Sequence, residues 1–292
     1  MLNAAIRYLV PLLALFAIGP VAGMLTGALR GHDGSGEASL LVCSAPMSGV
    51  LALFAVMGLA VLMGVIAARV ISQRTGLFSA GLVLAWAAWG TGRVDLILTQ
   101  PHTEGALTML AIEGLLVGVL GVIGAAIILR VPTMHSALPE VRDPEHRHHH
   151  PAPEPTEYFD STVPAAIGVA VAAAGVMVWL FAQETQKGQT FAASAIAGIA
   201  GAAGARVVAP RVSAVWVFAA VGILAAVSPL IASFVHAGTG QLVHAALAGK
   251  LFVLARVLPL DWVAGAFVGA PIGLVWAGSM VDRHMEPVAA RR

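Results

Sequence analysis

The chain has 292 residues, of which 59% are hydrophobic and only 11% are charged, and its mean hydropathy is +0.88. Soluble domains carry roughly 25% charged residues, so this composition excludes an ordinary water-soluble protein. The formal net charge of +1 provides no clustered excess of Lys and Arg, and nucleic acid is therefore not expected as a partner. The single cysteine, Cys43, excludes an intrachain disulfide and a cysteine-based metal site.

Apolar runs of about 20 residues recur along the chain, and each is long enough to cross the hydrocarbon core of a bilayer as a helix. We therefore predict an all-α, polytopic transmembrane helical bundle of about eight spans, with nine as the alternative. Segment 241–257 decides between eight and nine, because it is short and contains Lys250 and Arg256. The eight expected spans are about 8–29, 47–71, 76–98, 105–131, 163–183, 189–209, 212–235 and 262–281.

Lys and Arg in the short loops predict the orientation, because basic loops are retained on the cytoplasmic side of a membrane. With eight spans and the N-terminus inside, the basic tail from Arg283 to Arg292 also lies inside. A ninth span at 241–257 would send this tail outside, which the same rule disfavours. We expect both termini in the cytoplasm and the chain in a bacterial-type inner (plasma) membrane.

A weak internal similarity relates the two halves of the chain at an offset of 137 residues. Residues 68–70, followed by Arg74, match residues 205–207, followed by Arg211. This similarity predicts a parallel four-plus-four internal repeat, related by an axis along the membrane normal, as in some transporters. Chance alignment of helices rich in Ala, Gly and Val is the alternative.

A polar stretch at 132–162, rich in proline and charge, separates a first membrane half at 1–131 from a second half at 163–292. Such a composition does not form a packed core, so we predict a disordered cytoplasmic linker. Neutral imidazole is a ligand for zinc and similar divalent metals, and a solvated tether without metal is the alternative. The candidate metal ligands are His146, His148, His149 and His150.

The histidine run at 146–150 resembles the His-rich cytoplasmic loop of the eight-helix zinc transporters known as the ZIP family. The resemblance covers this loop alone. Members of that family carry His and carboxylate ligands inside their transport helices, and the apolar segments here contain no His-x-x-x-His or His-Asn-x-x-x-Asp pattern. No family is assigned on this basis.

Ionisable residues inside predicted spans are the default functional candidates, because charge is costly in lipid. Glu113 lies about eight residues into the fourth predicted helix, and Arg93 lies near the outer end of the third. We predict an Arg93–Glu113 ion pair, with Lys250 approaching Glu113 across the repeat axis and Asp95 directed elsewhere. The functional interpretation makes Glu113 a proton or cation carrier, and the alternative makes it a structural pin.

Glycines spaced four apart mark two predicted helices. Gly265, Gly269 and Gly273 share one face of the last helix, and Gly114 and Gly118 share a face of the fourth. Small residues let helices approach closely within a membrane. Packing within the chain is the main interpretation, and contact with another copy or with other membrane subunits is the alternative.

Common enzyme motifs are missing from the sequence: there is no Walker-type loop, no Gly-x-Ser-x-Gly elbow and no His-Glu-x-x-His helix. We predict no catalytic residue. The leading hypothesis is a small-solute or ion transporter, or a permease subunit, surrounded by the lipid bilayer. The alternative is a structural or assembly subunit of a membrane complex, with no transport activity of its own.

Overall fold

The computed structural model describes residues 2–101, 105–133, 161–236 and 239–289. Within these ranges the chain is all-helical, and seven of the helices are long and apolar enough to cross a membrane. The predicted class is thus confirmed: the protein is a multi-pass helical membrane protein. The seven segments are Tyr8–Gly27, Pro46–Val70, Ala106–Leu129, Val163–Phe181, Lys187–Val208, Val215–Val235 and Pro259–Ser279.

The helical elements follow the predicted spans closely, with short extra elements between some of them. In chain order they are α1 (Leu2–Leu13), the π-helical turn η1 (Ala14–Ile18), α2 (Gly19–Gly27), α3 (Pro46–Val70), α4 (Gln73–Gly90), α5 (Val94–Leu98), α6 (Ala106–Leu129), α8 (Val163–Phe181), α9 (Lys187–Val208), α10 (Val215–Val235), α11 (Thr239–Leu247), the 3-10 turn η2 (Val253–Arg256) and α12 (Pro259–Ala289).

Helix α4 is a further long helix of the bundle, and it packs against α2, α3 and α12. Gln73 and Arg74 in its first turn lower its hydropathy, and it is not among the seven segments above. The predicted span at 76–98 ends early, at Gly90. The N–H of Gly92 donates a hydrogen bond to the carbonyl of Ala38 at 2.7 Å, and this contact with a distant loop ends the helix.

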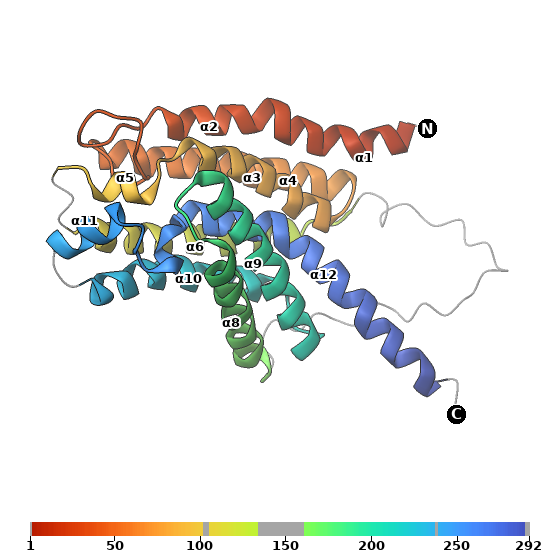
Figure 1. The fold of residues 1–292 in the computed structure, drawn as a ribbon. Helices are drawn as coiled ribbons and strands as arrows, with labels where there is room; N and C mark the ends of the chain where they lie inside the picture. Colours follow the sequence, from red (N-terminus) through yellow and green to blue (C-terminus); the bar gives the residue numbers. More distant parts are fainter. Residues whose placement is uncertain (1, 102–104, 134–160, 237–238, 290–292) are drawn as a thin grey trace.

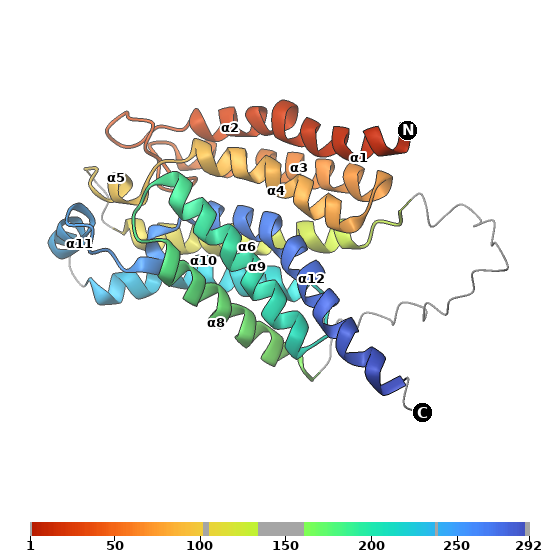
Figure 2. The ribbon, with the colours of Figure 1, turned by 45° about the vertical axis from the view of Figure 1, so that its right-hand side comes forward.

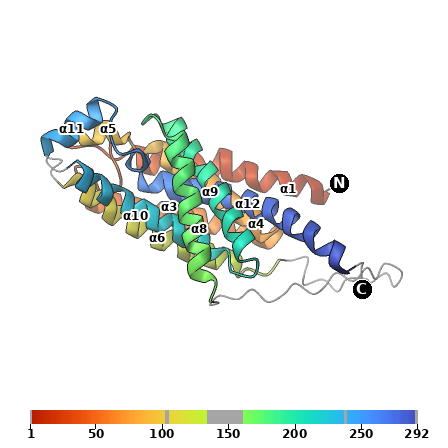
Figure 3. The ribbon, with the colours of Figure 1, turned by 60° about the horizontal axis from the view of Figure 1, so that its bottom comes forward.

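The long helices run between two ends of the bundle (Figure 1). We call the end where α1 begins and α12 finishes the terminal end, and the opposite end, which carries α5 and α11, the loop end. Helices α6 and α10 lie side by side, and α5 lies next to α11 (Figures 1 and 3). Both ends of the described chain therefore lie at the same end of the bundle, as the eight-span topology requires.

One hydrophobic core joins the two predicted halves, because its buried side chains extend from Val10 to Ala270. Glycine permits its closest helix contacts. Gly114 and Gly118 of α6 face the backbone of α10, and Gly265 and Gly269 of α12 face the backbone of α9. Gly273 continues the second contact. These glycine faces are thus occupied by helices of the same chain.

The predicted internal repeat is not supported by the packing of the helices. The similarity equates α3 with α9, yet α3 packs along α4 whereas α9 packs along α8 and α12. It also equates segment 241–257 with α6. That segment contains the end of α11, a turn and η2, so it forms no ninth span.

Helices α8, α9 and α12 run obliquely to the layer formed by α1 to α4 (Figures 1 and 2). Helices α4 and α12 touch at Gly81, where a Cβ would lie 2.7 Å from the backbone of Phe267 and Val268, so a side chain would not fit. Beyond this contact the two helices diverge toward the terminal end. The bundle is consequently closed at its middle, and a groove lies between α4 and α12 toward the terminal end.

Candidate functional site

Residues 28–45, between α2 and α3, fold over the loop end of the bundle, and we call them the plug segment. Ala38, Ser39 and Leu40 are at most 1% exposed, although they belong to a loop. Gln100 Nε2 donates to the carbonyl of Glu37 at 2.5 Å, and the backbone N–H of Arg93 donates to the Glu37 carboxylate at 2.7 Å. The plug segment is therefore fixed to the chain that follows α4.

Glu113 of α6 is fully buried and bonds to the plug segment. Ser39 Oγ lies 2.6 and 2.7 Å from its two carboxylate oxygens, and the N–H of Leu41 donates to one of them at 2.9 Å. At 1.5 Å per residue, Glu113 lies roughly 10 Å from the start of α6. Within the described chain no ion pair includes Glu113. A carboxylate inside a spanning helix is thus held by neutral donors alone.

Lys187, which is half-buried, and the buried Asp261 form an ion pair between the first turns of α9 and α12. Lys187 Nζ lies 3.0 and 3.1 Å from the two oxygens of Asp261, and the two side chains are 13% and 1% exposed. Lys187 also donates to Thr91 Oγ1 at 2.7 Å, which connects α9 to the end of α4. Thr190 Oγ1 donates to Asp261 at 3.3 Å. Four polar groups thus satisfy one another where three helices meet.

Glu113, Lys187 and Asp261 constitute what we call the buried charge cluster. The two parts of this cluster are joined through consecutive residues: Ser39 bonds to Glu113 and Thr91 to Lys187, and the N–H of Gly92 donates to the carbonyl of Ala38. Next to Asp261, the Nε1 of the fully buried Trp262 has no hydrogen-bond partner in the part of the chain that the structure describes. The cluster therefore combines a buried acid and an ion pair on α6, α9 and α12.

The predicted Arg93–Glu113 pair is wrong, and so is the prediction that Asp95 is directed away from Arg93. Arg93 Nη2 lies 2.6 Å from Asp95 Oδ2 and also donates to Thr185 Oγ1 at 3.3 Å. The reason is the early end of α4. Arg93 has an extended backbone just before α5, so its side chain and that of Asp95 do not diverge as they would within a helix.

Lys250 lies in the turn after α11 and is exposed. In the described structure no hydrogen bond or ion pair joins it to Glu113. Its predicted approach to Glu113 depended on an internal repeat that the packing does not support. The four residues predicted as one intramembrane polar site thus divide into buried Glu113, the Arg93–Asp95 pair at the loop end and exposed Lys250.

Arg256 is a buried cation that bonds only to backbone carbonyls. Its guanidinium group donates to Leu251 and Gly249, each at 3.0 Å, and to Ala182 and Gln183. Burial lowers the pKa of Arg256 from its ordinary value. Since the carbonyls belong to the end of α8 and to the turn before η2, Arg256 joins these two parts of the loop end.

The four histidines of the predicted metal site, His146, His148, His149 and His150, lie outside the described residues, as does most of the linker. Among the residues that are described, no group of three or more His, Cys, Asp or Glu side chains is arranged to hold a metal ion. The zinc site in the linker stays a prediction.

Sequence reasoning missed Lys187, Asp261 and Ser39. Lys187 and Asp261 lie just before the predicted spans at 189–209 and 262–281, and Ser39 lies in a polar loop. The one signal in the sequence was a charge directly before an apolar run at both positions. Ser39 is buried because the plug segment folds onto Glu113, and Lys187 and Asp261 are shielded where α9 and α12 meet the end of α4. The sequence pattern reveals neither contact.

Comparisons with protein-family models, with curated proteins and with solved structures found no match to this chain. Its class follows from the fold itself: the chain is a multi-pass α-helical membrane protein with a charge cluster buried near one end of the bundle.

Proposed function

We propose that the protein is a small-solute or ion transporter, or the permease subunit of one, and that Glu113 is its protonation or ion-binding group. The observation that carries this proposal is the burial of Glu113 inside a spanning helix without a cationic partner. Burying a carboxyl group in a membrane is costly, and such groups usually act in proton or ion pathways. A residue that only pinned two helices would be expected to have an ion-pair partner on the neighbouring helix.

The position of the buried charge cluster supports the same proposal. Its members come from α6 in the first predicted half and from α9 and α12 in the second. The plug segment covers Glu113 at the loop end, while α4 and α12 diverge at the terminal end. Transporters bind their substrates between halves that open alternately to the two sides. We assign the terminal end to the cytoplasm, because α3 ends, α4 begins and α9 ends there, and these helix ends carry Arg69, Arg74 and Arg206.

The assembly-subunit hypothesis depended on glycine faces that would bind other membrane proteins. Helices α9 and α10 of the same chain occupy those faces, so the glycines offer no surface to a partner.

Electrical measurement on proteoliposomes tests the proposal across many candidate solutes at once. Vesicles containing the protein are adsorbed to a solid-supported membrane and exposed to jumps of pH and of single solutes. The panel comprises monovalent and divalent cations, phosphate, carboxylates, amino acids and sugars. We expect at least one jump to evoke a current that Glu113→Gln abolishes.

Glu184→Gln is the matched control, because Glu184 is exposed at the same end of the bundle. It should leave the current unchanged. If Glu113→Gln reduces folding, Glu113→Asp keeps the carboxyl group and should retain a current with altered pH dependence. A current that persists unchanged in folded Glu113→Gln would overturn the assignment of Glu113, and silence of the wild-type protein across the panel would count against transport.

A further inference from the structure

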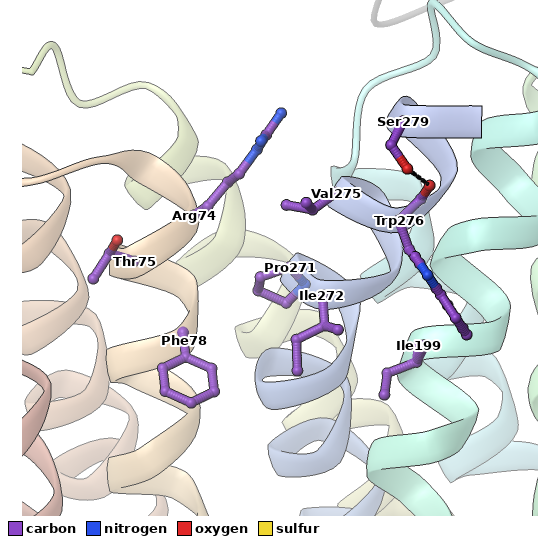
Figure 4. Close-up of a pocket in the computed structure, with 9 residues that line it drawn as sticks. All are labelled: Arg74, Thr75, Phe78, Ile199, Pro271, Ile272, Val275, Trp276 and Ser279. Atoms are coloured by element: carbon purple, nitrogen blue, oxygen red, sulfur yellow. Dashed lines mark hydrogen bonds between the residues drawn. The ribbon is translucent and has the colours of Figure 1, made fainter. Parts of the chain in front are cut away.

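A groove of about 640 Å³ opens on the side of the bundle where α4 and α12 diverge. Figure 4 shows Phe78 of α4 on one side of it and Ile199 of α9 with Ile272 of α12 on the other. Ile272 is 46% exposed and Val275 is 49% exposed. Apolar side chains left uncovered in a helical membrane protein meet lipid or another apolar molecule, so the groove suits a hydrocarbon chain.

Arg74 is the one charged residue among those that line the groove. It is exposed in the first turn of α4, and Figure 4 shows its guanidinium group extending toward the same end of the groove as Ser279. In the described structure the guanidinium group of Arg74 makes no hydrogen bond or ion pair. A cation in the first turn of a helix is also disfavoured by the helix dipole. Arg74 therefore provides a positive charge that a bound anion would stabilise.

The length of the groove matches one membrane leaflet. From Pro271 to Ser279 the chain of α12 rises by about 12 Å at 1.5 Å per residue. Half of a hydrocarbon core of roughly 30 Å is about 15 Å. An acyl chain lying along the groove would thus extend through most of one leaflet, with Arg74 close to the level of the lipid headgroups.

A second groove, between α6 and α10, is purely apolar and serves as a comparison for the groove beside Arg74. It has a volume of about 390 Å³ and is lined by residues such as Val119, Ile223 and Val227, with no charged side chain. The groove beside Arg74 differs from it in carrying a guanidinium group at its end. This difference distinguishes a site for one kind of lipid from general contact with hydrocarbon.

We propose that the groove between α4 and α12 binds one anionic glycerophospholipid, with an acyl chain against Phe78, Ile272 and Val275 and the headgroup phosphate against Arg74. Guanidinium groups bind phosphate through paired, charge-assisted hydrogen bonds, and basic pockets between spanning helices recognise anionic headgroups. The inference does not depend on the transport proposal, because it uses none of the residues of the buried charge cluster.

Native mass spectrometry of the delipidated protein in micelles that contain phosphatidylglycerol or phosphatidylcholine tests this site. We expect one tightly retained phosphatidylglycerol and weaker retention of phosphatidylcholine. Arg74→Gln should reduce retention of phosphatidylglycerol at least tenfold, and Ile272→Trp, which fills the groove, should do the same. Arg74→Lys keeps the charge and should lose less than Arg74→Gln.

Two matched controls separate this site from general effects of charge and surface. Arg69→Gln removes an exposed arginine at the same end of the bundle, and Ile223→Trp fills the purely apolar groove. Both should leave retention unchanged. Equal losses in Arg69→Gln and Arg74→Gln, equal retention of the two lipids, or displacement of the lipid by millimolar inorganic phosphate alone would overturn the proposal.

Discussion

Lys187 at the start of α9 and Asp261 in the first turn of α12 form an ion pair that is almost entirely shielded from solvent, with Nζ–O distances of 3.0 and 3.1 Å. Asp261 suits its position, because a carboxylate at the N-terminal end of a helix is favoured by the helix dipole. Lys187 does not suit its own position, since the same dipole at the start of α9 disfavours a cation. The charge of Lys187 at this position is therefore stabilised by Asp261 and not by the helix dipole.

Removing one member of this pair should destabilise the protein strongly. Asp261→Asn or Lys187→Met leaves a buried charge without its partner, which typically costs about 3–5 kcal/mol. The double variant, which removes both charges, should lose clearly less than the sum of the two single losses. Unfolding in mixed micelles by titration with denaturing detergent measures all three values. Additive losses would show that the two side chains do not interact.

The plug segment should open more readily when its bond to Glu113 is removed. Ser39→Ala leaves a buried carboxylate with one donor fewer, at a cost of about 1–3 kcal/mol. Cys43 of the same segment reports the opening, because it is the only cysteine and is 1% exposed. Its labelling by a maleimide should accelerate about tenfold in Ser39→Ala, since tenfold corresponds to about 1.4 kcal/mol. Ser44→Ala, an exposed change nearby, should label at the wild-type rate.

The labelling of Cys43 should also depend on pH. Burial raises the pKa of the Cys43 thiol above its ordinary value of 9.0, so the thiol stays protonated near neutral pH and reacts slowly. The folded state binds this proton more tightly than the unfolded state does. The resulting stabilisation is complete below pH 9.0 and is lost as the pH rises through the higher folded-state pKa. We expect the labelling rate in the folded protein to keep rising above pH 9.0. A rate equal to that of a free thiol at pH 7.5 would contradict the burial of Cys43.

The contact between α6 and α10 should not tolerate a methyl group at Gly118. A Cβ at this position would lie 2.7 Å from the Cα of Gly222, and backbone on both sides leaves little room to move. We expect Gly118→Ala to lower stability by about 1–3 kcal/mol through overpacking. Gly58→Ala is the control, because no atom lies within 4 Å of a Cβ there. It should leave stability unchanged or raise it by up to about 1 kcal/mol.

Arg256 should be required for the structure of the loop end. Arg256→Met removes donors from four backbone carbonyls and should cost about 2 kcal/mol or more. Lysine lacks the planar fork of arginine, so Arg256→Lys should recover only part of this loss. Arg30→Lys, at an exposed arginine that bonds to neighbouring carbonyls, should change the melting temperature little. Equal effects of Arg256→Lys and Arg30→Lys would refute the structural role of Arg256.

Much of the fold was predictable from the sequence, because an apolar run of spanning length indicates a helix that lies in lipid. The spans at 47–71 and 105–131 differ from α3 and α6 by at most two residues at either end. The span at 76–98 was too long by eight residues because a contact between Gly92 and the plug segment ends α4. The hydropathy pattern along the sequence does not predict such a contact.

The site was predictable only in part, because contacts between residues far apart in the chain leave no signal in the sequence pattern. Glu113 stood out because it interrupts an otherwise apolar helix. Its partners did not, since Ser39 is 74 residues away in a polar loop. Lys187 and Asp261 have the sequence context of ordinary helix ends, and they are shielded because α9 and α12 meet the end of α4 at that point.

The central claim is that Glu113 changes its protonation state within the folded protein. Infrared difference spectroscopy of the reconstituted protein, recorded while the pH is varied across the range in which it stays folded, observes carboxyl groups directly. We predict a pH-dependent band from a protonated carboxyl group that is lost in Glu113→Gln, kept in Glu184→Gln and shifted in Glu113→Asp. A wild-type spectrum whose carboxyl bands are identical to those of folded Glu113→Gln at every pH would contradict the claim and leave Glu113 as a structural bond to the plug segment.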